Sequence, residues 1–234
     1  MDRNYPEGAD LYQQIIHVTR YAKYRPDLQR REFWNETVDR YADFMESMVH
    51  ERTPYHMTNL EVSNLREAIW NFRVMPSMRA VMTAGPAAAK DNMAIYNCSY
   101  APIKDHRVFS ELLYILMCGT GVGFSVERQY VNQLPAIPEV LTLEPGEYVV
   151  DDSKMGWAES LQHLLDSLYS GRIPKFDYSM VRPKGAILKT FGGRASGPDP
   201  LKDLHRFIIS TFTHATGRKL NSLECHDIAC KIGE

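Results

Sequence analysis

The chain has 234 residues, 44% of them hydrophobic and 24% charged, which is ordinary for a globular protein with one large core or two smaller ones. Lys and Arg number 27 against 29 Asp and Glu, so a net charge of -2 gives no chain-wide basic surface for direct DNA binding or for an anionic membrane. No apolar run approaches the roughly 18 residues of a membrane span, and the polar start MDRNYPEGAD is unlike a secretory signal, so the sequence predicts a cytoplasmic protein without a membrane partner.

Apolar residues recur at helical spacing through the first 73 residues. They predict two helices separated by a break at Arg25-Pro26, with the stripes Leu11, Ile15, Val18, Ala22 and Trp34, Val38, Tyr41, Met45, Met48. A capping box at Thr58 and Glu61 starts a third helix, expected to end near Arg73.

The middle of the chain alternates strands and helices. Residues Ala94 to Tyr96 are expected to form a short buried strand that ends at Asn97-Cys98. A helix capped by Asp105 should stop at Cys118-Gly119, and Val122, Phe124 and Val126 alternate as the next strand.

Three further helices are expected after residue 150. One begins at Ser153 and ends near Gly171, one begins at Asp199-Pro200, and one begins near Ser222 or Glu224. Strands that alternate with helices favour an α/β sheet or barrel behind a helical N-terminal segment.

The four cysteines are too few for a disulfide framework in a chain of this length, so each is expected as a free thiol. A cysteine in an apolar run is most often a small buried hydrophobe. For Cys98, the polar neighbours Asn97 and Ser99 at a strand end favour a site, whereas Cys118 fits packing. The spacing of Cys225, His226 and Cys230 does not predict zinc, and no metal site is expected.

The glycine turn from Gly119 to Gly123 follows a helix and enters a strand, the reverse of the order in a dinucleotide site, so no NAD is predicted. Glycine lets a ligand approach the backbone without a Cβ in the way. The alternative is a plain helix C-cap followed by a bulge.

Two other segments have the composition of an anion site. The helix start at Asp151, Asp152, Ser153 and Lys154 offers free N–H groups and one lysine, with simple N-capping as the alternative. A glycine-rich loop carries four cations that suit phosphate, although a solvated loop would look the same: Arg182, Lys184, Lys189, Arg194.

Five collinear motifs resemble the N-terminal half of the large catalytic subunit of ribonucleotide reductase, in particular its adenosylcobalamin-dependent class II and compact phage forms. The motifs are PSMRAVMTAG at 76–85, YNCSY at 96–100, MCGTGVGFSVE at 117–127, DSKMGWAESL at 152–161 and RPKGAILKTFGGRASGP at 182–198. The resemblance implies an N-terminal helical segment at 1–73, and at 74–234 the first half of a ten-stranded α/β barrel, truncated at the C-terminus.

The resemblance also implies site residues. Cys98 is expected to be one of two thiols that reduce the ribose and end as a disulfide, in a thioredoxin-dependent ribonucleoside-triphosphate or diphosphate reductase that uses thiyl-radical chemistry. The residues expected at the substrate are Ser77, Met78, Asn97, Ser99 and Gly121. The helix start at Asp152, Ser153 and Lys154 is expected at the effector site that sets base specificity.

One departure from the family is severe. The radical-bearing cysteine of an Asn-x-Cys-x-Glu loop and the second reducing cysteine have no counterpart here, so the isolated chain is expected to be inactive without a C-terminal half, as a split subunit or as a fragment. The expected partners are that half, a ribonucleotide, a deoxynucleotide or ATP effector, and thioredoxin or a similar dithiol. The radical comes from adenosylcobalamin or from a separate metal-containing subunit. The alternative function is a nucleotide-binding effector module without redox activity.

Overall fold

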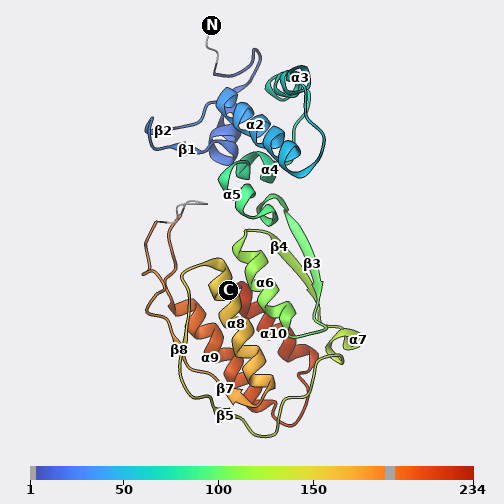
Figure 1. Ribbon diagram of the computed structural model, residues 1–234, viewed down its shortest axis with the longest axis vertical. Helices are drawn as coiled ribbons and strands as arrows, with labels where there is room; N and C mark the ends of the chain where they lie inside the picture. The colour runs from blue at the N-terminus through green and yellow to red at the C-terminus, as the bar shows by residue number, and fades with distance from the viewer. Residues whose placement is uncertain (1–3, 188–192) are drawn as a thin grey trace. The chain divides into compact units, whose positions relative to one another are not determined.

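The computed structural model describes residues 4–187 and 193–234 (Figure 1). Contacts divide the chain into an N-terminal unit, Met1–Tyr96, and a C-terminal unit, Asn97–Glu234. The expected division lay at residue 73, but the segment 74–96 packs with the N-terminal unit, because Val81 and Ala84 join the core around Trp34.

The N-terminal unit is mostly helical. A short antiparallel pair of strands separates its first helices at the expected break. Its elements are α1 (Leu11–Ile16), a π-helix (His17–Tyr21), β1 (Tyr24–Arg25), β2 (Arg30–Arg31), α2 (Trp34–Arg52), α3 (Asn59–Trp70), α4 (Met78–Thr83), α5 (Pro86–Lys90) and a 3-10 helix (Asn92–Ile95).

The second and third helices follow the sequence pattern. Trp34, Val38 and Tyr41 of α2 are buried, and the ring of Trp34 stacks on that of Phe72 at a centroid distance of 5.2 Å. The Thr58 hydroxyl accepts the N–H of Glu61 at 3.3 Å, and the Thr58 N–H donates to the Glu61 carboxylate at 2.8 Å. The predicted capping box is therefore confirmed, since both of its hydrogen bonds are present.

The first helix buries a different face from the one predicted. Leu11, Ile15 and Val18 are 72%, 51% and 39% exposed, whereas His17 is 4% exposed. The imidazole of His17 holds the helix to the core through Tyr5 at 2.8 Å and Thr37 at 2.9 Å. A π-turn from His17 to Tyr21 also shifts the helical register. The regular spacing of apolar residues therefore predicted the wrong buried face.

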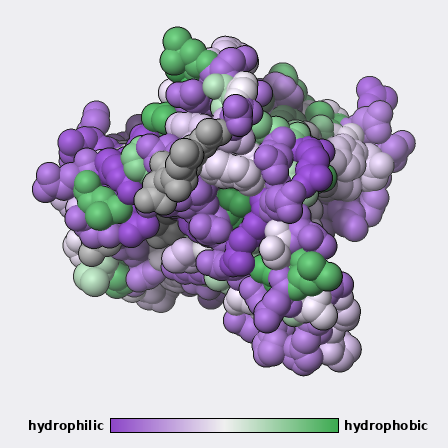
Figure 2. Space-filling view, turned by 90° about the horizontal axis from the view of Figure 1, so that it is seen from above, coloured by the Kyte–Doolittle hydropathy of each residue, from purple (hydrophilic) through white to green (hydrophobic). Residues whose placement is uncertain are grey.

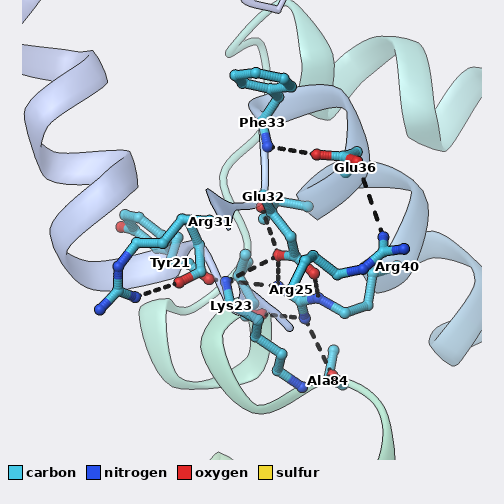
Figure 3. A network of polar contacts seen from close by, with 12 residues as sticks. Tyr21, Lys23, Arg25, Arg31, Glu32, Phe33, Glu36, Arg40 and Ala84 are labelled. Carbon is cyan, nitrogen blue, oxygen red and sulfur yellow. Dashed lines mark hydrogen bonds and ion pairs between the residues drawn. The ribbon is translucent and has the colours of Figure 1, made fainter. Parts of the chain in front are cut away.

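Figure 3 shows a polar network of this unit around the carboxylate of Glu32. Arg40 from α2 donates to that carboxylate and to the carbonyl oxygens of Val81 and Ala84. Lys23 donates its ammonium to the Ala84 carbonyl at 2.6 Å. These bonds attach the segment after α3 to the first strands and α2, which explains why that segment belongs to this unit.

The strand predicted at Ala94 to Tyr96 is absent. Asp91 accepts the N–H of Met93 at 3.0 Å and starts a 3-10 turn, and the strand begins only at Cys98. An aspartate that binds the backbone two residues ahead favours a turn over an extended chain. Cys98 is therefore the first residue of its strand, where the sequence pattern placed it at the end of one.

The C-terminal unit is a mixture of helices and short parallel strand pairs. Its elements are β3 (Cys98–Pro102), α6 (Arg107–Met117), β4 (Gly121–Ser125), α7 (Arg128–Val131), β5 (Thr142–Leu143), β6 (Tyr148–Val149), α8 (Lys154–Tyr169), β7 (Arg172–Ile173), β8 (Phe176–Asp177), α9 (Asp199–His214) and α10 (Ser222–Gly233). The strands pair as β3 with β4, β5 with β7 and β6 with β8. The predicted α/β class is confirmed, whereas the half-barrel stays a prediction.

Four helices, α6, α8, α9 and α10, lie side by side in this unit and form its core (Figure 1). Phe109, Leu112 and Leu113 from α6 meet Leu161, Leu164 and Leu168 from α8, the same stripes that the sequence pattern selects. Gly171 ends α8 at a φ of 80°, as predicted. This helical core carries β3 and β4 on its flank.

The start of α8 offers a direct test of its cap. The Ser153 hydroxyl accepts the N–H of Gly156 at 3.0 Å, so Ser153→Ala should lower the free energy of unfolding by about 1 kcal/mol. Urea unfolding, with hydrogen exchange of the α8 amides, measures the change. Ser170→Ala is the matched control, because the exposed Ser170 hydroxyl donates to Asp166 at the other end of the helix and caps no N–H group. Equal losses in both variants would contradict the cap.

On the face drawn in Figure 2, hydrophilic residues cover most of the surface and hydrophobic residues form small separate groups. Among the described residues, no helix combines the length and the apolar character needed to cross a membrane.

Candidate functional site

The candidate site is built on the parallel strands β3 and β4, which α6 connects. Cys98 is in register with Gly121, and the pairing continues without a bulge to Pro102 and Ser125. The N–H of Gly121 donates to the carbonyl of Asn97 at 3.0 Å, and the Ser99 hydroxyl donates to the carbonyl of Gly121 at 3.2 Å. The structure thus brings four predicted site residues together: Asn97, Cys98, Ser99 and Gly121.

The two faces of this strand pair differ. Ala101, Val122 and Phe124 pack against the helical core, as alternate residues of a strand should when one face is covered. The exposed residues Cys98, Tyr100, Gly121 and Gly123 alternate with them, and we call these four residues the thiol–glycine face. The sulfur of Cys98 therefore lies outside the apolar core and beside the glycine turn.

The glycines of the turn do not all occur for the same physical reason. Gly119 ends α6 with a φ of 81°, which is the helix cap of the plain alternative. Gly121 and Gly123 have no positive φ. A Cβ would lie 3.6 Å from a backbone oxygen at Gly121, and at Gly123 it would lie 3.8 Å from a backbone oxygen and 4.0 Å from the Tyr100 ring, all of which are ordinary contacts. The fold of the C-terminal unit therefore does not require glycine at these two positions. The missing side chains leave the backbone beside Cys98 open.

Two further predicted substrate residues, Ser77 and Met78, belong to the N-terminal unit. The Ser77 hydroxyl caps α4 by accepting the N–H of Ala80 at 3.1 Å, and Met78 is 44% exposed. Within their own unit these residues start a short helix, and their role as substrate contacts stays a prediction.

Each side chain of the predicted effector site has a partner within the C-terminal unit. Ser153 caps α8, and Asp152 accepts the guanidinium of Arg182 at 2.7 Å and its backbone N–H at 3.2 Å. The Lys154 ammonium lies 3.0 Å from the sulfur of Cys118. Simple N-capping thus accounts for Ser153, and Arg182 holds the loop that follows β8 against the start of α8.

The basic loop is described only in part. Arg194 donates to the carbonyl of Gly185 at 3.0 Å and closes a turn across the loop, and Arg182 is engaged by Asp152. Lys189, one of the four cations predicted here, lies outside the described residues. A phosphate role for this loop stays a prediction.

Two of the other cysteines are packing residues. Cys118 and Cys225 are 1% and 0% exposed, and burial raises the pKa of the Cys225 thiol to about 12. A thiol held in its protonated form reacts slowly, since the thiolate is the nucleophile. Across residues 4–187 and 193–234, no group of three or more His, Cys, Asp and Glu side chains could hold a metal ion.

Sequence reasoning missed two contacts between elements. The Arg182–Asp152 pair joins residues 30 apart, and the Lys154–Cys118 contact joins residues 36 apart. Each residue by itself looked like a loop cation, a cap or a packed thiol. Only the fold, which brings both the loop after β8 and the end of α6 to the start of α8, shows that they meet.

Comparisons with known proteins agree with the resemblance in the motifs. Residues 138–210 match the family model for the insertion domain of B12-dependent ribonucleotide reductase. A probable adenosylcobalamin-dependent ribonucleoside-triphosphate reductase of Dictyostelium discoideum is 27% identical over 98% of this chain and 34% of its own length. An adenosylcobalamin-dependent ribonucleoside-triphosphate reductase of Euglena gracilis is 28% identical over 97% of this chain and 33% of its own length. A putative one from Mycobacterium phage D29 is 28% identical over 80% of this chain and 31% of its own length.

The fold agrees as well. A crystal structure of a B12-dependent class II ribonucleotide reductase superimposes with a TM-score of 0.80 over 94% of this chain and 39% of that one, at 21% identity. The chain spans about a third of the length of the curated relatives it matches. Motifs, sequence comparisons and fold together show that the chain resembles the N-terminal part of the adenosylcobalamin-dependent class II ribonucleotide reductases.

Proposed function

We propose that the chain is the N-terminal part of a ribonucleotide reductase and that Cys98 is one of its two reducing thiols. The observation that carries the proposal is the thiol–glycine face, where an exposed thiol stands beside two glycines that the fold does not require. A sugar ring could approach the sulfur there without meeting a side chain at Gly121. The first half of a ten-stranded barrel remains part of this proposal, and its support is that β3, α6 and β4 form a parallel strand–helix–strand unit, which is the kind of unit that such a barrel would repeat.

The chemistry needs two thiols. A ribonucleotide loses its 2'-hydroxyl as water and gains hydrogen at the same carbon, while two cysteine thiols become one disulfide. Cys98 can supply one electron and one proton to this balance. The second thiol and the thiyl radical are proposed to come from sequence that the relatives have beyond the matched third. Thioredoxin or a similar dithiol would then reduce the disulfide.

Neither of two cavities in the described residues fits adenosylcobalamin. A cavity of about 270 Å³ lies beside α9 and α10, and one of about 430 Å³ lies on α3. Both are in the range of drug-sized ligands or below it, a corrinoid is larger, and neither is lined by a residue of the thiol–glycine face. We therefore propose that any cobalamin contacts, like any contact with a separate radical subunit, lie in the remaining part of the reductase.

Reconstitution tests the proposal. The chain should be inactive alone, and mixing it with the remaining segment of a matched relative should give ribonucleotide reduction with a dithiol. Cys98→Ser should lower the steady-state turnover rate at least about a hundredfold, because no disulfide can form. Nucleotide binding and the circular dichroism spectrum should stay unchanged. Full turnover with Cys98→Ser would show that the thiol is not a reductant.

The rival function is an effector-binding module without redox chemistry. It predicts that the chain binds deoxynucleotides or ATP while no complement restores activity. We propose the start of α8 as the effector contact, and Lys154→Met should then weaken nucleotide binding measured by calorimetry. Because Asp152 and Ser153 already have partners, their substitution should act mainly through the stability of α8.

A further inference from the structure

The contact between Lys154 and Cys118 joins two helices of the C-terminal unit, and the proposed function makes no use of this sulfur. The ammonium of Lys154 lies 3.0 Å from the sulfur of Cys118. This is the length of an ordinary N–H···O hydrogen bond, although sulfur is a larger atom and a weaker acceptor than oxygen. The amine and the thiol are therefore in unusually close contact.

Both groups are held in place by the helices that carry them. Lys154 is the first residue of α8, and Cys118 directly follows the last residue of α6. These two helices pack against each other in the core of the unit. The Lys154 ammonium also lies 5.5 Å from the centre of the Tyr114 ring, and Tyr114 is four residues before Cys118, on the same side of α6. The side chain of Lys154 thus contacts two neighbouring residues of α6, which fixes its position beside the sulfur.

The four cysteines differ in what surrounds their sulfur. Cys98 and Cys230 are exposed. Cys118 and Cys225 are buried, and among the contacts between described residues only the sulfur of Cys118 has a lysine amine at hydrogen-bond distance. Because Cys118 is 1% exposed, its sulfur is open to small reagents and shielded from bulky thiols. A sulfenic acid formed there would therefore meet the Lys154 nitrogen before it met another thiol.

We propose that Cys118 and Lys154 form a redox modification site, at which hydrogen peroxide joins the two side chains through one oxygen atom. The first peroxide replaces the S–H bond of the thiol by an S–OH group, and water leaves. A second peroxide accepts the two electrons released when the sulfenic oxygen gives up its hydrogen and bonds to the lysine nitrogen, which loses one N–H bond. One thiol, one amine and two peroxides thus become one N–O–S bridge and three waters.

The geometry favours an oxygen bridge over a direct bond between nitrogen and sulfur. Two single bonds that meet at a bent oxygen span slightly less than the 3.0 Å that separates the two atoms, so the bridge requires little movement of either side chain. A direct S–N bond is much shorter and requires a larger displacement of the lysine. A reductant that supplies four electrons, such as two molecules of a dithiol, returns the amine, the thiol and one water.

The bridge would also place the proposed effector contact under redox control, and this consequence rests on the proposed function. A nitrogen bonded to oxygen is a much weaker base than an alkylamine, so the bridged Lys154 carries no positive charge at neutral pH. Nucleotide binding by the reduced chain tests the effector contact, whereas the bridge forms without any nucleotide. The two proposals can therefore fail separately.

Mass spectrometry of the 234-residue chain tests the bridge. Cys98→Ser and Cys230→Ser first remove the two exposed thiols, so that no disulfide between chains interferes. After treatment with hydrogen peroxide, the intact chain should gain one oxygen atom and lose two hydrogen atoms. Trypsin should then give one cross-linked peptide that contains Cys118 and Lys154 and is uncut after Lys154. A dithiol should restore the starting mass and the normal cleavage.

Substitutions at the site and at a matched lysine complete the design. Cys118→Ser and Lys154→Met should each abolish the cross-linked peptide. Lys202→Met is the control, because the Lys202 ammonium also lies 5.5 Å from a tyrosine ring, that of Tyr178, and contacts no cysteine among the described residues. This variant should form the bridge in the same yield as the chain with Lys202. Circular dichroism establishes that each variant is folded, and the peptide map of the chain with Cys118 and Lys154 intact does not depend on them.

Four results would overturn the proposal. The first is a peroxide-treated chain in which Cys118 is unchanged or carries only sulfinic or sulfonic acid. The second is a cross-link without added oxygen, which is a direct S–N bond. The third is a cross-link that a dithiol does not reverse, which is a sulfinamide of the same mass. The fourth is a cross-link from Cys118 to a lysine other than Lys154.

Discussion

Replacing Arg40 by methionine should lower the free energy of unfolding of the N-terminal unit by about 3–5 kcal/mol, the usual cost of breaking a buried ion pair. The side chain of Glu32 is 4% exposed and that of Arg40 is 16% exposed. Arg40 gives the carboxylate two hydrogen bonds, at 2.8 and 2.9 Å. Burial, the largest single effect, would raise the pKa of Glu32, but the hydrogen bonds and charge of Arg40, together with hydrogen bonds from the Lys23 N–H and the Thr37 hydroxyl, keep this pKa below its usual value. Without Arg40, the carboxylate stays buried with no guanidinium beside it.

The measurement can be limited to the N-terminal unit. Trp34 and Trp70 lie in this unit, and Trp157 lies in the C-terminal unit. In a Trp157→Phe background, tryptophan fluorescence during urea unfolding therefore reports on the N-terminal unit alone. Arg73→Met is the control, because Arg73 pairs with Glu67 where both side chains are more than half exposed, and no change beyond experimental error is expected. The variant Glu32→Gln with Arg40→Met should recover part of the loss. A small loss in Arg40→Met would contradict the structural role given to the network.

Much of the helical structure could be predicted from local signals. The capping box at Thr58, the stripe of α8 and the glycine after it each act within a few residues, so the sequence pattern is sufficient. The prediction for the first helix was wrong because a π-turn and the buried His17 decide which face lies inside. The partners of His17 lie 12 and 20 residues away in the sequence. The prediction of a strand before Cys98 was wrong because the Asp91 side chain favours a turn.

The candidate site divides in the same way. The meeting of Cys98 with the glycine turn could be predicted, since β3 and β4 are joined by one helix and adjacent parallel strands commonly pair. The ion pair of Asp152 with Arg182 could not, because it depends on how a long loop returns to the start of α8.

The second large effect is expected in the C-terminal unit, which acid should destabilise through His205. This histidine is 1% exposed, its Nδ1 lies 2.8 Å from the hydroxyl of Tyr178, and burial lowers the pKa of His205 to about 3. The unfolded chain takes up a proton near pH 6.5 and the folded chain does not. The contribution of His205 is therefore complete above pH 6.5 and is lost as the pH falls toward 3. At about 1.4 kcal/mol for each unit, the total loss is roughly 3–5 kcal/mol.

Urea unfolding at pH 7, 6, 5 and 4 measures this loss, with hydrogen exchange of the α8 and α9 amides to assign it to the C-terminal unit. That assignment is needed because burial also lowers the pKa of His17, to about 4, which gives the N-terminal unit a pH dependence of the same sign. His205→Gln keeps a polar group near Tyr178 and removes the titration. This variant should be less stable at pH 7 but should lose less stability between pH 6 and pH 4. The slope of its free energy of unfolding against pH should be smaller by up to the contribution of about one proton. Parallel pH profiles for the two proteins would mean that His205 is protonated in the folded unit, and that its burial does not govern the acid sensitivity of the helical core.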